Sequence, residues 1–220
     1  MIEQRRINLG RYFSPGLAEH LVADERLTGL GGQQKMVSVV FADITGFTSL
    51  VEVNAVEDVV EVLNRFFETV VPVIFSHGGM LDKFLGDGVM SVFGIPDADD
   101  MDPVKAIQCA VDIQKSMQAL KNRLQDDGLF PIEVGIGIAS GVVLAGNIGT
   151  KEQMNYTVIG EPVNLAQRLE SISNPGEIVV SSVTTGMIPE SAHLDVEFEP
   201  MGTIHVKGIS RDVNPLRILY

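Results

Sequence analysis

The sequence lacks several features that mark particular classes of protein. It has a single cysteine, Cys109, so no disulfide can form within the chain, and a reducing, cytoplasmic setting is expected. No apolar stretch approaches the roughly 18 residues that span a bilayer, and the N-terminus does not resemble a signal peptide. No internal repeat is visible. These absences predict a soluble globular protein with no membrane segment in this chain.

Basic residues are also scarce. The chain has 16 Lys and Arg against 29 Asp and Glu, which gives a formal net charge of -13 at pH 7. This balance argues against a nucleic-acid polymer as partner, because such contacts depend on basic patches that face phosphate. It leaves room for a nucleoside triphosphate, whose charge can be met locally by metal ions and a few Lys or Arg side chains.

The 220 residues are enough for one domain with a short appendage. Residues 1–34 are predicted to be a helical segment, which begins at Ser14-Pro15, followed by a glycine-containing linker. Residues 35–220 are predicted to form the main domain. From residue 35 on, apolar patterns of strand and helix alternate. The predicted strands cover 37–42, 80–85, 89–93, 132–138, 142–145, 156–159, 178–181, 203–206 and 216–219, and the predicted helices cover 55–76, 102–124 and 162–172.

This pattern predicts an α+β fold in which a mostly antiparallel sheet carries helices on one face. A tight turn at Ser140-Gly141 is expected to join the strands 132–138 and 142–145. Cys109 lies among apolar residues of the predicted helix 102–124, so it is interpreted as part of the core rather than as a nucleophile.

Two acidic residues follow apolar runs. Asp43 ends the predicted strand 37–42, and Asp87 lies in the turn Gly86-Asp87-Gly88. Taken singly, each has an ordinary explanation, as a helix N-cap and as a hairpin turn. Together they predict a divalent-metal site, since paired carboxylates repel unless a cation lies between them. The backbone N–H groups that follow Asp43 would suit a polyphosphate.

Three segments carry a family resemblance: FADITGF at 41–47, DKFLGDG at 82–88 and YTVIGEPVNLAQR at 156–168. With these motifs in order, residues 35–220 closely resemble the catalytic domain of class III nucleotidyl cyclases, and bacterial adenylyl cyclases most of all. The resemblance implies a ferredoxin-like (βαββαβ-type) core with an added hairpin. It also implies a head-to-tail homodimer whose active sites lie between the two protomers.

The resemblance assigns roles to individual residues. Asp43, the Ile44 carbonyl and Asp87 match the ligands of two divalent cations per site, Mg²⁺ or Mn²⁺. Lys83 and Thr157 match the two base-reading positions, where a lysine donor suits N1 of adenine and is mismatched to the N1–H of guanine. The remaining matches are Thr45, Gly46 and Phe47 for the triphosphate, Asn164 and Arg168 for the transition state, and Lys207 for the terminal phosphates.

The implied function is an adenylyl cyclase that converts ATP to 3′,5′-cyclic AMP and pyrophosphate. A guanylyl cyclase, a catalytically silent nucleotide-sensing dimer module and a small interaction domain are the alternatives. Residues 1–34 resemble the segment that often joins a sensor to such domains, so an upstream sensor or regulatory domain is expected; an ordered extension of a complete small enzyme is the other interpretation. No residue decides whether bicarbonate activates the protein.

Overall fold

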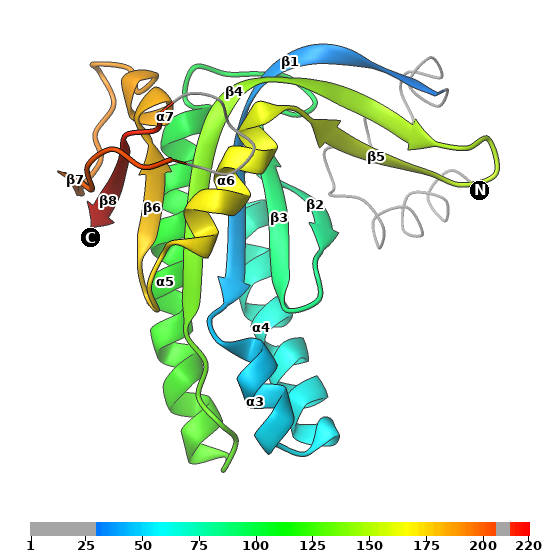
Figure 1. The fold of residues 1–220 in the computed structure, drawn as a ribbon, viewed down its shortest axis with the longest axis vertical. Helices are drawn as coiled ribbons and strands as arrows, with labels where there is room; N and C mark the ends of the chain where they lie inside the picture. The colour runs from blue at the N-terminus through cyan, green and yellow to red at the C-terminus, as the bar shows by residue number, and fades with distance from the viewer. Residues whose placement is uncertain (1–29, 206–211) are drawn as a thin grey trace.

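A single sheet organises the chain, and helices pack against it (Figure 1). The structure is a computed structural model that describes residues 30–205 and 212–220. Its elements are β1 (Gly31–Ile44), α3 (Phe47–Val53), α4 (Val56–Ser76), β2 (Met80–Phe84), β3 (Gly88–Phe93), α5 (Asp102–Asp126), β4 (Val134–Gly149), β5 (Met154–Ile159), α6 (Glu161–Ser171), β6 (Ile178–Ser181), α7 (Ser182–Gly186), β7 (Glu197–Pro200) and β8 (Pro215–Leu219).

The strand order within the described residues is β2-β3-β1-β4-β6-β8-β7, and β5 pairs with β4 off this path. Between the strands of the described residues, every pairing is antiparallel except that of β4 with β6. The first four strands lie in the order β2-β3-β1-β4 with helices in the connections, which is the arrangement of a ferredoxin-like core. The predicted α+β class with an antiparallel-rich sheet is confirmed.

Alternating residues of the central strand β1 build a core on each side of the sheet. Val40 and Ala42 belong to a cluster that includes residues of α4 and α5. Val39 and Phe41 belong to a second cluster that includes residues of α6. The two long helices therefore share one face, and α6 covers the other, where Figure 1 shows it crossing in front of the sheet. The prediction that all helices lie on one face is wrong for α6.

The long helices form where apolar residues recur at helical spacing. The residues of α4 that are buried are Val59, Val62, Phe66, Val70 and Ile74. Helix α5 has Pro103 in its first turn and buries Cys109 completely. Burial raises the pKa of the Cys109 thiol far above its usual range. Cys109 is therefore part of the core, as the sequence predicted.

The predicted turn at Ser140-Gly141 is wrong, because β4 continues through it. Ser140 pairs with Ser38 of β1, and the two buried hydroxyl groups lie 2.7 Å apart. Gly141 serves close packing instead: a Cβ at this position would lie 2.8 Å from Cγ of Pro162 at the start of α6. The small residues that suggest a turn in the sequence let helix and sheet approach here.

The strand β1 begins at Gly31, and residues 31–34 pair with residues 144–147 of β4. These four residues were predicted to be linker, so the sheet extends further toward the N-terminus than the sequence indicated. The predicted helix and the linker residues before Leu30 lie in residues 1–29, outside the described residues. Near the C-terminus, only an isolated bridge from Ile204 to Val213 lies in the predicted strand 203–206, and Val206 is itself outside the described residues.

The strand β7 was not predicted; it pairs with β8 at the edge of the sheet. Of the helices in the described ranges, none combines the length and the apolar character needed to cross a membrane.

Candidate active site

The two predicted metal-binding acids lie together at one end of the sheet. Asp43, next to the last residue of β1, is directly opposite Gly88 of β3. The preceding residue, Asp87, accepts a hydrogen bond at its backbone oxygen from the Ile44 N–H, 3.2 Å away. The side chains of Asp43 and Asp87 are close enough to share a hydrogen bond. The hairpin turn therefore returns Asp87 to the strand end that carries Asp43.

Electrostatics at this pair favour a cation. Burial, followed by the negative charge of Asp87, raises the pKa of Asp43 to about 7. The charge of Glu170 acts in the same direction. A divalent ion between the carboxylates would remove this unfavourable interaction, and hard oxygen ligands are those that Mg²⁺ and Mn²⁺ bind. The residues present thus fit the metal site that the sequence predicted.

Glu170 is an acidic residue of this region that the sequence motifs do not indicate. It lies on α6, and burial, more than any other effect, raises its pKa; the charge of Asp87 raises it further, and a hydrogen bond from Ser171 lowers it. The sequence could not place Glu170 near the aspartates, because only the packing of α6 on β4 brings it there. In the sequence, the one indication that Glu170 lies close to the protein interior is its position directly after the buried Leu169.

The connection after β1 reaches α3 through a left-handed glycine. Gly46 has φ 72°, and a Cβ built on it would meet nothing within 4 Å. The glycine is therefore required by backbone conformation. The N–H of Thr45 donates to the Glu133 carbonyl oxygen at 2.9 Å, so this structure satisfies it within the chain. The N–H of Phe47 is the first of helix α3, where amides lack partners within the helix.

The predicted base-reading residues contact each other across two strands that are not neighbours in the sheet. Lys83 of β2 donates from Nζ to Oγ1 of Thr157 on β5 at 2.8 Å. Asp82, which the sequence analysis did not single out, joins them: its Oδ1 lies 2.6 Å from Lys83 Nζ, and both its carboxylate oxygens lie 2.9 Å from Thr157 Oγ1. We call these three residues the Asp82–Lys83–Thr157 triad.

A β-bulge brings Asp82 into the triad. The register between β2 and β3 shifts between Leu81 and Lys83, so that Asp82 is the extra residue. Leu81 packs against the cluster of α4 and α5, and the ring of Phe84 meets that of Phe67 on α4 edge to face. Regular alternation would place Asp82 and Lys83 on opposite faces; the bulge turns both away from α4.

Helix α6 presents the predicted transition-state pair. Asn164 and Arg168 are exposed and four residues apart, so they share the face opposite the buried Leu165 and Leu169. In the described residues they lie at the surface of this single chain. Lys207, the predicted phosphate ligand, lies outside the described residues.

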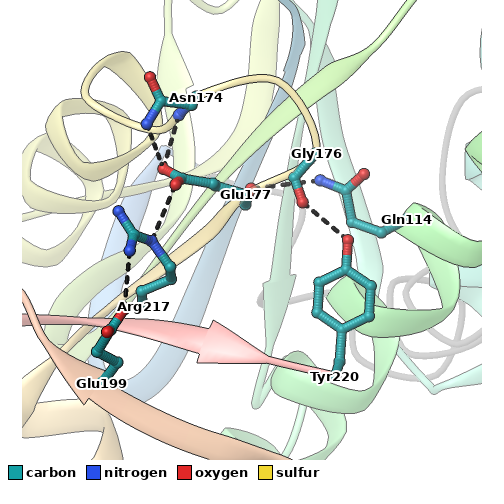
Figure 2. A network of polar contacts seen from close by, with 7 residues as sticks. All are labelled: Gln114, Asn174, Gly176, Glu177, Glu199, Arg217 and Tyr220. Carbon is teal, nitrogen blue, oxygen red and sulfur yellow. Dashed lines mark hydrogen bonds and ion pairs between the residues drawn. The ribbon is translucent and has the colours of Figure 1, made fainter.

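A polar network surrounds the loop before β6 (Figure 2). The Gly176 N–H donates to Val134 of β4 at 3.0 Å, and its carbonyl accepts from the Tyr220 hydroxyl at 2.8 Å. Arg217 of β8 pairs with Glu177 at 2.9 Å and donates to Glu199 at 2.8 Å. The C-terminal strand is thereby tied to the loop before β6. Ser173 of that loop packs against Gly135, the residue of β4 that pairs with Asp43.

Solved structures with this fold include cyclases of both substrate classes. The adenylyl cyclase CyaB from P. aeruginosa is 36% identical, with a TM-score of 0.81 over 87% of this chain and 97% of that one. The guanylyl cyclase Cya2 is 35% identical, with a TM-score of 0.79 over 86% of this chain and 94% of that one.

Sequence relatives include longer mycobacterial proteins. An uncharacterized protein of Mycobacterium tuberculosis is 38% identical over 182 residues, which are 82% of this chain and 32% of that protein. Another, of Mycobacterium bovis, is 38% identical over 184 residues, which are 83% and 31%. The chain thus spans about a third of the length of these relatives. The family model described as the adenylate and guanylate cyclase catalytic domain matches residues 32–216. The chain belongs to the adenylate and guanylate cyclase catalytic domain family.

Proposed function

We propose that this chain is an adenylyl cyclase that converts ATP to 3′,5′-cyclic AMP and pyrophosphate. The observation that carries the choice of ATP is the contact of Lys83 with Thr157, which sets a donor beside a hydroxyl group at the predicted base-reading positions. A lysine can only donate, and N1 of adenine accepts whereas N1–H of guanine does not. A mismatch of this kind in a buried site costs on the order of 1–3 kcal/mol.

The reaction joins the ribose 3′-oxygen to the α-phosphorus and breaks the bond from that phosphorus to the bridging oxygen of pyrophosphate. The 3′-hydroxyl proton is released in the process. Asn164 orients the ribose, and Arg168 stabilises the negative charge that develops on the α-phosphate. The chemistry that Mg²⁺ or Mn²⁺ supplies when bound by Asp43, Asp87 and the Ile44 carbonyl is acidification of the 3′-hydroxyl and neutralisation of the leaving pyrophosphate.

The active site is shared between two copies of the chain in a head-to-tail homodimer. Asp43 and Asp87 come from one protomer, and Lys83, Thr157, Asn164, Arg168 and Lys207 come from the other. The exposure of Asn164 and Arg168 in the single chain supports this arrangement, because side chains that stabilise a transition state need a substrate opposite them. Gly46 and Phe47 bind the triphosphate through their N–H groups, and Thr45 joins them only if its bond to Glu133 opens.

Product analysis tests the proposal. Purified protein is incubated with ATP or GTP in the presence of Mn²⁺ or Mg²⁺, and nucleotides are separated by chromatography. Cyclic AMP from ATP, with little cyclic GMP from GTP, is the expected result. Preferential formation of cyclic GMP would favour the second candidate, a guanylyl cyclase, which the similarity to Cya2 supports. Binding without any product would contradict both and indicate a silent nucleotide-sensing module.

The relatives' greater length supports a sensor or regulatory domain elsewhere in the full protein. The cytoplasmic setting stays a prediction from cysteine usage.

A further inference from the structure

We propose that Asp82 determines the nucleotide specificity of this site: its buried carboxylate fixes the Thr157 hydroxyl as a hydrogen-bond acceptor and thereby selects adenine over guanine. The inference rests on the proposed function, in which Lys83 and Thr157 face the base. The sequence motifs assign a role to Lys83 and Thr157 but none to Asp82.

The polarity of Thr157 follows from its partners. A hydroxyl group has one donor proton and two acceptor lone pairs. The ammonium group of Lys83, 2.8 Å from Thr157 Oγ1, can only donate and so occupies one lone pair. Both oxygens of Asp82 lie 2.9 Å from the same Oγ1, so the hydroxyl proton is directed to Asp82. One acceptor position of Thr157 is left for a ligand.

The polarity of Lys83 is fixed in the same way. One of its three N–H bonds is directed to Thr157 and one to Asp82 Oδ1, 2.6 Å away, which leaves one donor. The Lys83 side chain is 39% exposed, and the Asp82 side chain is fully buried. A ligand therefore meets the lysine donor and the threonine acceptor. Asp82 is a positioning residue, which orients both side chains through its contacts with them.

This donor and acceptor pair matches one base. The Watson–Crick edge of adenine offers an acceptor at N1 beside an amino donor at N6. Guanine offers a donor at N1 beside an acceptor at O6. A threonine with a free hydroxyl would not discriminate well, because it could turn its proton toward O6 of guanine. Asp82 removes that option, since the proton is already committed.

The bulge in β2 is the structural device behind this arrangement. In a regular strand, Asp82 would point to the face opposite Lys83 and could not reach Thr157. An extra residue at this point re-aims the carboxylate toward β5. The geometry gives the bulge a function in substrate selection.

The test compares kcat/KM for ATP and GTP in the 220-residue protein and its Asp82→Asn variant. An asparagine can donate from its amide to Thr157 and release the hydroxyl proton, so the preference for ATP should fall by about tenfold or more. The double variant Asp82→Asn/Thr157→Asp should recover the preference, because a carboxylate at 157 can only accept. Asp99→Asn is the matched control: Asp99 also pairs with a lysine, Lys105 at 2.7 Å, but lies away from the triad.

Equilibrium binding of fluorescent ATP and GTP analogues gives a second readout that does not require turnover, and Asp82→Ala provides a second variant should Asp82→Asn not fold. An Asp82 variant with an unchanged thermal melt and an unchanged preference for ATP over GTP would overturn the inference and leave the cyclase assignment intact. Absence of any cyclic product from the unmodified protein would instead refute the proposed function. A loss of affinity that is equal for both analogues would mean that Asp82 is merely structural.

Discussion

Gly137 of β4 lies directly beneath the backbone of Glu170 on α6. A Cβ at position 137 would overlap both the Glu170 nitrogen and the Ala166 oxygen. The helix that carries Asn164 and Arg168 is therefore held at a distance from the sheet that only glycine permits.

Replacing Gly137 by alanine should push α6 away from the sheet. We expect kcat to fall by at least about tenfold, because a displacement of less than 1 Å would misplace the proposed transition-state residues Asn164 and Arg168. Steady-state kinetics with ATP measure the effect. Gly186→Ala is the control, since a Cβ there would meet nothing within 4 Å. Equal activity of the two variants would show that the position of α6 does not limit the reaction.

The shared site predicts complementation between two inactive variants. In the proposed homodimer, Asp43→Ala removes a proposed metal ligand and Arg168→Ala removes the proposed transition-state cation, so each variant alone should retain under about 1% of the activity. A mixed dimer contains one site with all its residues intact and one site with both defects. When the two variants are refolded together or co-expressed, the mixed dimers should therefore recover a large part of the activity expected from one intact site per dimer. No recovery from two well-folded variants that form mixed dimers would contradict a site shared between protomers.

Asp43 should make the metal-free protein less stable as the pH rises. The folded state holds the proton of Asp43 with a pKa of about 7, against a usual value of 3.8, so deprotonation favours the unfolded chain. The unfolding free energy conferred by this group is greatest below pH 4 and is lost as the pH rises toward 7 and above. Since Asp43 is only partly buried, the loss should be on the order of 1–2 kcal/mol after solvent screening.

Chemical denaturation in EDTA at pH 5 and pH 8 measures this effect. Asp43→Asn should be more stable than the unmodified protein at pH 8, by a margin that shrinks at pH 5. Glu190→Gln, a change at an exposed acid far along the chain, should show no such margin. Added Mn²⁺ should raise the melting temperature of the unmodified protein but not that of Asp43→Asn. A pH-independent difference between the two would argue against the raised pKa.

Cys109 should be inert in the folded protein. It is fully buried in α5, and burial raises the pKa of its thiol, so the reactive thiolate is absent near neutral pH. Alkylation by iodoacetamide at pH 8, followed by mass spectrometry, should label less than about a tenth of the protein in the time that unfolded protein is labelled fully. Rapid labelling of the native state would contradict the core position.

The amino-acid pattern alone predicts the α+β class, the two long helices, the position of most strands and the pair of acids. These follow from local patterns: apolar periodicity marks the buried faces, and an acid after a buried strand or within a glycine turn stands out without knowledge of its neighbours. The continuity of β4 could not be predicted, because Ser140-Gly141 has the composition of a turn and only pairing with β1 keeps it extended.

The surroundings of the site residues depend on how separate elements pack together. Glu170 approaches Asp43 because α6 packs on the face of the sheet opposite α4 and α5. Asp82 contacts Thr157 because the bulge in β2 redirects its side chain toward β5, although Thr157 is 75 residues further along the chain. Sequence patterns report the burial of each element on its own, whereas these contacts depend on how separate elements are oriented in space. The physical reason is that side-chain direction at a bulge and helix position on a sheet are set by packing between elements, which no local pattern encodes.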